Sequence, residues 1–79
     1  MTIGEAVKNR IVELSIERNI SINKMSMMSG ITQSTLNNII SGRNNSTTVS
    51  TIKKICDGLG ISILDFFNSS VFSNLDDEL

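Results

Sequence analysis

The chain has 79 residues and so forms one small domain, because a chain of this length buries only about 60% of the surface it exposes when unfolded. With one cysteine and no histidine, it excludes an internal disulfide, histidine-based catalysis and a zinc site with the usual nitrogen and sulfur ligands. No apolar run approaches the roughly 20 residues of a membrane span, so we expect a soluble, cytoplasmic protein without a metal or other cofactor.

The formal net charge is −1, but the charges are unevenly distributed along the chain. No acidic residue lies between Glu17 and Asp57, and this interval holds five of the seven basic residues. The local field matters more than the net charge when a polyanion approaches one face of a protein. The distribution therefore favours a nucleic-acid partner, with chance clustering in a small protein as the alternative.

Apolar residues recur at helical spacing along the chain, and strand signals are weak. The first helix is expected to begin after Thr2, which forms a capping-box pattern with Glu5. It is expected to end near Asn19, because asparagine tolerates the left-handed conformation that ends helices. Its buried face is predicted to consist of Val7, Ile11 and Leu14.

The second and third helices are also marked by their end signals. Ser21 can cap the second helix and Gly30 ends it, while Thr32 can cap the third and Gly42 ends it. The inward residues are predicted to be Met25 and Met28 in the second helix and Leu36, Ile39 and Ile40 in the third, with Met27 at the surface or in an interface.

Two further helices follow the polar loop GRNNSTT. The fourth is expected to be capped by Thr47 or Thr48 and to end at Gly60, and a shorter fifth helix to run from Ser62 through Phe67. The predicted fold is all-α and compact, with five helices in residues 1–68 and a C-terminal tail in residues 69–79. The buried stripe of the fourth helix is predicted to be Val49, Ile52, Ile55 and Leu59.

The second and third helices are joined by the short glycine-centred turn SGIT, which is typical of a helix-turn-helix. In that motif the second helix of the pair enters the major groove while the first crosses the DNA backbone. The predicted outward face of the third helix is rich in amides and hydroxyls, which can donate and accept hydrogen bonds at base edges. Carboxylates would be repelled by phosphate, and residues 30–45 contain none.

The segments NISINKMSMMSGITQSTLNNIISGRNN and TVSTIKKICDGLGISILDFF together resemble the lambda-repressor-like helix-turn-helix family. This family includes phage repressors, Cro and bacterial regulators of the xenobiotic-response-element type, and the resemblance covers about residues 3–68. It implies a sequence-specific transcriptional regulator of duplex DNA from a bacterium or phage, with a repressor as the working assignment. The sequence does not choose between promoter occlusion and polymerase recruitment.

Carried over by position, the resemblance also assigns individual contacts. Base edges are expected to be read by Gln33, Ser34, Asn37 and Asn38, with phosphate binding as an alternative for Asn37. For each residue the competing interpretation is an ordinary solvated side chain. Phosphate contacts are expected from Asn23, Lys24, Thr35, Arg43, Asn44, Asn45 and Thr48.

The chain departs from the family pattern at two functional places. Ile22 stands where the family often has a glutamine that touches phosphate, so a polar DNA clamp is missing unless Asn23 or Lys24 replaces it. Ser15 and Ile40 stand where many members pair an arginine with a glutamate. We expect apolar packing in place of that ion pair, a replacement that is often neutral or stabilising.

The tail carries apolar residues outside the resembling region, and one member of the Phe66–Phe67 pair is expected to face outward. We expect a homodimer, which would match the two-fold symmetry of palindromic operators. A tail folded back over its own domain is the alternative. The runner-up function is a protein-interaction module, such as an antitoxin or adaptor that binds its partner through the tail, and an enzyme is the least expected class. The predicted dimer interface comprises Phe67, Val71, Phe72 and Leu75, with Leu79 as a further apolar residue of the tail.

Overall fold

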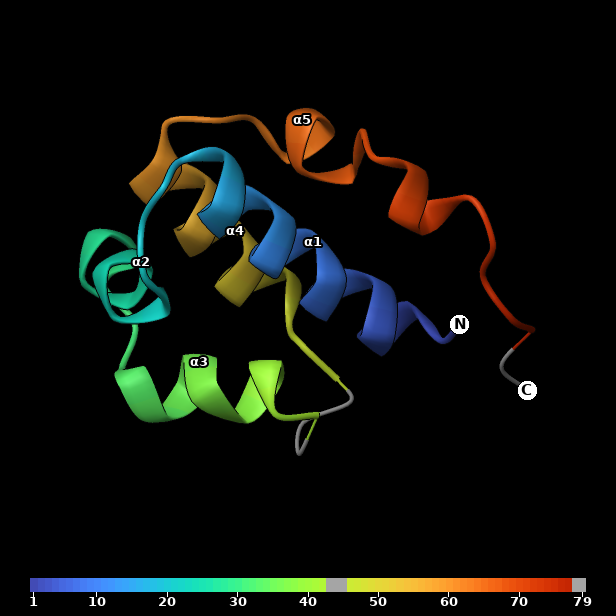
Figure 1. The fold of residues 1–79 in the computed structure, drawn as a ribbon, viewed down its shortest axis with the longest axis horizontal. Coiled ribbons are helices and arrows are strands. Elements are labelled where there is room, and N and C mark those ends of the chain that lie inside the picture. The colour runs from blue at the N-terminus through green and yellow to red at the C-terminus, as the bar shows by residue number, and fades with distance from the viewer. Residues whose placement is uncertain (43–45, 78–79) are drawn as a thin grey trace.

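The computed structural model describes residues 1–42 and 46–77, and within these ranges it is all-α, as predicted. The helix-turn-helix pair α2 and α3 forms one end of the molecule, and α2 packs against both α3 and α4 (Figure 1). No helix in the described ranges is long and apolar enough to cross a membrane. The elements are α1 (Ile3–Glu17), α2 (Ile22–Ser29), α3 (Gln33–Ile40), α4 (Val49–Leu59), α5 (Ile63–Phe67) and the 3₁₀-helix η1 (Ser70–Phe72).

A hydroxyl side chain precedes each of the five α-helices. Each hydroxyl oxygen accepts a hydrogen bond from the backbone N–H three residues later, which satisfies one of the N–H groups left free at a helix start. All five predicted starts are confirmed, including the capping box of Thr2 and Glu5. Asn19 has a φ of 52°, so the predicted left-handed end of α1 is confirmed too. The capping residues are Thr2, Ser21, Thr32, Thr48 and Ser62.

The core contains most of the predicted inward residues, but two predictions are wrong. The side chain of Met28 is 40% exposed and that of Val49 is 74% exposed. Val49 is the first residue of α4, and its side chain lies outside the core that begins at Ile52. The fully or nearly buried apolar residues are Ala6, Val7, Ile11, Leu14, Met25, Leu36, Ile39, Ile52, Ile55, Cys56, Leu59 and Phe66.

The error at Met28 has a packing cause. The buried face of α2 consists of Met25, Ser26 and Ser29, so two of its three members are serines that an apolar pattern does not reveal. Small residues there let the backbone of α2 approach α4 closely, and Met28 is left at the flank of the contact. Met27 is exposed, as predicted.

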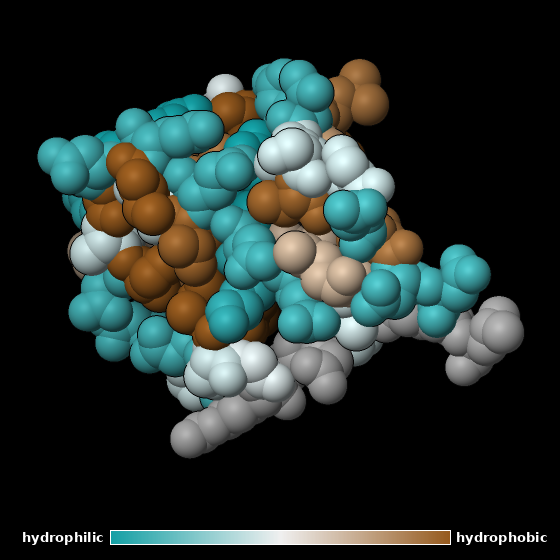
Figure 2. All heavy atoms as spheres, turned by 45° about the vertical axis from the view of Figure 1, so that its right-hand side comes forward, coloured by the Kyte–Doolittle hydropathy of each residue, from teal (hydrophilic) through white to brown (hydrophobic). Residues whose placement is uncertain are grey.

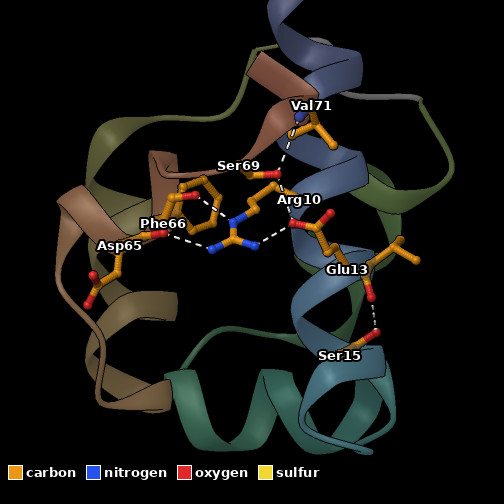
Figure 3. A network of polar contacts seen from close by, with 8 residues as sticks. Arg10, Glu13, Ser15, Asp65, Phe66, Ser69 and Val71 are labelled. Atoms are coloured by element: carbon orange, nitrogen blue, oxygen red, sulfur yellow. Dashed lines mark hydrogen bonds and ion pairs between the residues drawn. The ribbon is translucent and has the colours of Figure 1, made fainter. Parts of the chain in front are cut away.

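Arg10 connects α1 to the end of α5 by hydrogen bonds, a role that was not predicted from the sequence. Its side chain is buried, like those of the apolar residues Val7, Ile11 and Leu14 of α1. Figure 3 shows it pointing from α1 toward the backbone of Asp65 and Phe66. Its Nε donates to the carbonyl oxygen of Phe66 at 2.6 Å, and Nη2 donates to that of Asp65 at 2.7 Å. Nη1 donates to the carboxylate of Glu13, which lies one turn further along α1. The guanidinium thereby satisfies two carbonyl groups near the C-terminal end of α5.

Residues 69–77 lie against α1 of the same chain. The Ser69 hydroxyl donates to Glu13 at 2.8 Å and also accepts from the N–H of Val71 at 3.3 Å (Figure 3). At the other end of the tail, the α-amino group of Met1 donates to the carbonyl oxygen of Asn74 at 3.0 Å and pairs with the carboxylate of Asp76 at 3.3 Å. The tail is therefore held at two separate places, at Glu13 on α1 and at Met1, which precedes α1.

Many family members form an ion pair between α1 and α3. This chain has no charged side chain at either of the two positions, Ser15 and Ile40. Ser15 is buried, and its hydroxyl donates to the carbonyl oxygen of Val12 at 2.7 Å within α1. Ile40 is half-buried and packs against the core. Both positions are thus filled without placing a charge in the interior, in agreement with the sequence interpretation.

Candidate nucleic-acid interface

The turn between α2 and α3 is made by three residues, and its first residue requires glycine. Gly30 has φ 67° and ψ 26°, a left-handed conformation that glycine adopts without steric cost. The N–H of Ile31 then donates to the carbonyl oxygen of Ser26 at 3.2 Å, which closes the end of α2. Thr32 caps α3 directly afterwards. In Figure 1 α2 is seen nearly end-on and α3 from the side, so the two axes are steeply inclined.

The helix α3 is anchored on one side and open on the other. Leu36 and Ile39 are buried in the core, and α3 forms the lower edge of the molecule in Figure 1. The opposite side of α3 carries the side chains predicted to read bases. Gln33, Ser34 and Asn37 are exposed and Asn38 is half-buried; we call these four residues the amide face.

The polar groups of the amide face are free to bind a partner. Within the described ranges, no hydrogen bond engages the side chains of these four residues. The hydroxyl of Thr35, by contrast, lies 2.8 Å from that of Thr32, where the two can share a hydrogen bond. Polar side chains that are ordered on a helix but unpaired are suited to hydrogen bonding with an external ligand such as a base edge.

The predicted phosphate contacts lie at helix starts. Asn23 and Lys24 are exposed in the first turn of α2, Thr35 is exposed in the first turn of α3, and Thr48 caps α4. Helix starts favour anions through their free N–H groups and the helix dipole. Within the described part of the chain, the ammonium group of Lys24 pairs with no carboxylate. The remaining three predictions, Arg43, Asn44 and Asn45, lie outside the described residues.

No carboxylate lies on α2 or α3. The described acidic side chains lie on α1, near the end of α4, on α5 and in the tail, and several are already engaged. Glu13 bonds Arg10, and Asp57 pairs with Lys53 on α4. The two helices of the helix-turn-helix thus have no acidic side chain of their own to repel a phosphate backbone.

Other kinds of site find little support in the described residues. No cluster of three or more histidine, cysteine, aspartate or glutamate residues there could hold a metal ion. A hollow between the start of α1 and residues 46–47 has a volume of about 140 Å³, below the 300–1,000 Å³ typical of small-molecule pockets. Burial raises the pKa of the Cys56 thiol, which disfavours a nucleophilic thiolate.

Comparison with known proteins agrees with this geometry. Residues 10–69 match the model of the Cro/C1-type HTH DNA-binding domain. A solved structure described as the crystal structure of the prophage Lp1 protein 11 is 40% identical to this chain and superposes with a TM-score of 0.78. The match covers 87% of this chain and 91% of that one. No curated protein matches the chain.

Proposed function

Because the chain belongs to the Cro/C1-type helix-turn-helix family of DNA-binding domains, we propose that it is a sequence-specific transcriptional repressor that inserts α3 into the major groove of duplex DNA. The observation that carries this proposal is the amide face. Its side chains are exposed or half-buried and make no hydrogen bond within the described residues. Their amide and hydroxyl groups match the hydrogen-bond donors and acceptors of base edges. Such binding needs no cofactor, and we assign the chain no catalytic activity.

Phosphate contacts would fix the position of α3 in the groove without reading sequence. We assign this role to Asn23, Lys24, Thr35 and Thr48, which lie in the first turns of α2 and α3 and at the start of α4. Lys24 is the only positively charged side chain among these four residues. Together with Asn23 it would supply the phosphate contact that the family often makes through a glutamine at the position of Ile22. Arg43, Asn44 and Asn45 complete the proposed set.

We further propose that the protein binds as a homodimer in the cytoplasm of a bacterium. Phe67 and Leu75 are about 40% exposed, and Val71 and Phe72 are half-buried beside them in the sequence. Figure 2 shows hydrophobic side chains reaching the surface of one face of the molecule between hydrophilic ones. Pairing of two such surfaces would bury apolar area and place two copies of α3 on a two-fold symmetric site.

Selection of binding sites from a random duplex pool at low salt tests this function, because phosphate contacts are strongest there. The wild type is expected to enrich a palindrome, and the double variant Gln33→Ala/Asn37→Ala to enrich none. Asn68→Ala is the matched control, since it removes an exposed amide beyond α5 and is expected to enrich the wild-type palindrome.

Enrichment of nothing by the wild type would contradict DNA reading and favour the runner-up, a module that binds a protein partner through its exposed apolar side chains. Enrichment of one site by all three proteins would retain DNA binding but move base reading away from α3. Because the chain has no Trp or Tyr, protein concentration is best set by amino-acid analysis.

A further inference from the structure

Glu13 on α1 connects the end of α5 to the start of the tail. Its carboxylate oxygen Oε1 accepts a hydrogen bond from the guanidinium of Arg10 and another from the hydroxyl of Ser69, the latter at 2.8 Å (Figure 3). Hydrogen bonds to a charged group are about twice as strong as those between neutral groups. We call Arg10, Glu13 and Ser69 the Glu13 network.

The two partners of Glu13 hold different segments of the chain. Arg10 also donates to the carbonyl oxygens of Asp65 and Phe66, so it holds the C-terminal end of α5. Ser69 is the N-cap of η1, so its side chain holds the start of that helix. The carboxylate of Glu13 therefore fixes the position of η1 relative to α5.

The position of η1 decides how the aromatic rings near the C-terminus are arranged. Phe72 belongs to η1, whereas Phe66 and Phe67 belong to α5. The ring centroid of Phe72 lies 4.9 Å from that of Phe67 and 6.3 Å from that of Phe66. Phe66 is buried, but Phe67 is exposed and Phe72 is half-buried. The apolar surface at this end of the molecule is thus assembled from two separate segments.

Packing alone holds η1 weakly. None of its three residues is buried, and the next attachment of the tail lies beyond it, where the N–H of Asp76 donates to the carbonyl oxygen of Met1 at 2.9 Å. Residues 70–77 also follow the segment that matches the family model. The Glu13 network is therefore the polar attachment nearest to the start of η1 in the described part of the chain.

We infer that the Glu13 network positions the dimer surface: it holds η1 against α5 so that Phe67 and Phe72 form one surface for a second copy of the chain. This inference rests on the proposed homodimer. It goes further in assigning the preorganisation of the surface to three polar residues. A surface that is ordered before association strengthens binding, because the cost of ordering it is not incurred on binding.

Sedimentation equilibrium tests the inference, at a temperature at which circular dichroism shows every variant to be folded. Glu13→Gln is expected to raise the dimer dissociation constant about tenfold, the equivalent of one hydrogen bond to a charged group. Lys53→Gln is the matched control, since it breaks the exposed ion pair with Asp57 on α4 and is expected to keep the wild-type constant.

A double-mutant cycle tests whether the two residues act through their shared hydrogen bond. Ser69→Ala is also expected to raise the dimer dissociation constant. The double variant Glu13→Gln/Ser69→Ala is expected to raise it by less than the product of the two single effects, because each substitution weakens or removes the same bond. Single effects that multiply fully would contradict a shared action.

Nuclear Overhauser contacts between aromatic ring protons separate positioning from a general effect on stability. The contact between Phe67 and Phe72 is expected in the wild type and is expected to weaken in Glu13→Gln. The contact between Phe66 and Phe67, which lie on the same helix with centroids 5.0 Å apart, is the internal control and is expected to persist.

The outcomes separate this inference from the homodimer on which it rests. A dimeric wild type with an unchanged dissociation constant in Glu13→Gln would overturn the inference and retain the homodimer. A weakened dimer that keeps the wild-type contact between Phe67 and Phe72 would overturn the positioning role as well. A wild type that is monomeric at every concentration would overturn the homodimer and the inference with it.

Discussion

Ser29 carries a buried hydroxyl group with no hydrogen-bond partner among the described residues. It lies on the face of α2 that packs against α4. An unpaired buried hydroxyl costs about 1–3 kcal/mol in proteins, so its presence reflects the size required at this position more than its polarity. Ser26 is also buried, but its hydroxyl donates to the carbonyl oxygen of Asn23 at 2.7 Å.

We therefore predict that Ser29→Ala raises the free energy of unfolding by about 1 kcal/mol, because it removes the unpaired oxygen without adding volume. Ser26→Ala is the matched control, and it is expected to give a smaller gain or a loss because it removes a hydroxyl that is already bonded. Urea denaturation of the three proteins measures the difference. A loss of stability in Ser29→Ala that exceeds that in Ser26→Ala would show that the Ser29 hydroxyl has a partner.

At the scale of elements, the contact between α2 and α4 depends on Gly58. A Cβ atom at this position would lie 2.5 Å from the carbonyl oxygen of Met28 and 2.9 Å from the Cα atom of Ser29. Both are backbone atoms, which cannot move aside as a side chain can. The glycine therefore sets how closely the first helix of the helix-turn-helix approaches the rest of the core.

We predict that Gly58→Ala lowers the free energy of unfolding by about 1–3 kcal/mol, the usual cost of forcing extra volume into a packed interface. The sign is informative, because alanine at an open helix position stabilises by about 1 kcal/mol relative to glycine. Urea denaturation measures the shift in the free energy of unfolding. Lys54→Ala, on the exposed side of α4, is the matched control and is expected to change that free energy by less than about 0.5 kcal/mol. A stabilised Gly58→Ala would contradict the close approach.

We predict that the attachment of the tail to α1 weakens at acid pH, because it depends on the charged carboxylate of Glu13. The hydrogen bond from Ser69, followed by that from Arg10, lowers the pKa of Glu13 below its ordinary value of 4.5. A lowered pKa in the folded state means that the Glu13 carboxylate stabilises the fold above pH 4.5 and that this contribution is lost as the pH falls through the lowered pKa.

Glu13→Gln keeps the size of the side chain and removes its charge. We predict that its melting temperature lies below that of the wild type at neutral pH and that the difference shrinks as the pH falls below 4.5. Thermal unfolding between neutral and acid pH, followed by circular dichroism, measures both curves. Ser69→Ala should lower the melting temperature by less, and this difference from the wild type should also shrink at acid pH. A difference in melting temperature between Glu13→Gln and the wild type that stays constant over the whole pH range would contradict the role of the Glu13 charge.

At the scale of the whole molecule, the folded-back tail does not cover all the apolar surface near the C-terminus. The rings of Phe67 and Phe72 are 4.9 Å apart between centroids, and Phe67 contacts the buried Phe66 edge-on at 5.0 Å. Leu64 on α5 is nevertheless 83% exposed. This surface is the one on which the proposed homodimer depends.

We predict that the wild type sediments as a dimer and that Phe67→Glu/Leu75→Glu sediments as a monomer, because each carboxylate would have to be desolvated in an apolar interface. Ile16→Glu changes an exposed apolar residue of α1 and is the matched control, expected to remain dimeric. Analytical ultracentrifugation measures the masses, and circular dichroism confirms that the variants fold. A wild type that is monomeric at every protein concentration would contradict the homodimer.

The sequence by itself determined the five α-helices and their starts, because these depend on local chemistry. A hydroxyl accepts from an N–H three residues away, glycine or asparagine supplies the left-handed end, and apolar spacing of three to four residues marks the inner face. The same local signals placed Gln33, Ser34 and Asn37 on the outward side of α3, where the structure has them.

Only the tertiary structure decided which side chains fill the contacts between elements. The buried face of α2 is made mostly of serines because Gly58 brings two backbones together, so counting apolar residues placed Met28 inside although it lies at the flank. Arg10 sits three residues after Val7 on the apolar face of α1, but the two carbonyl groups that it bonds on α5 are more than fifty residues away in the sequence. Such partners are set by how the helices pack, and local spacing carries no information about them.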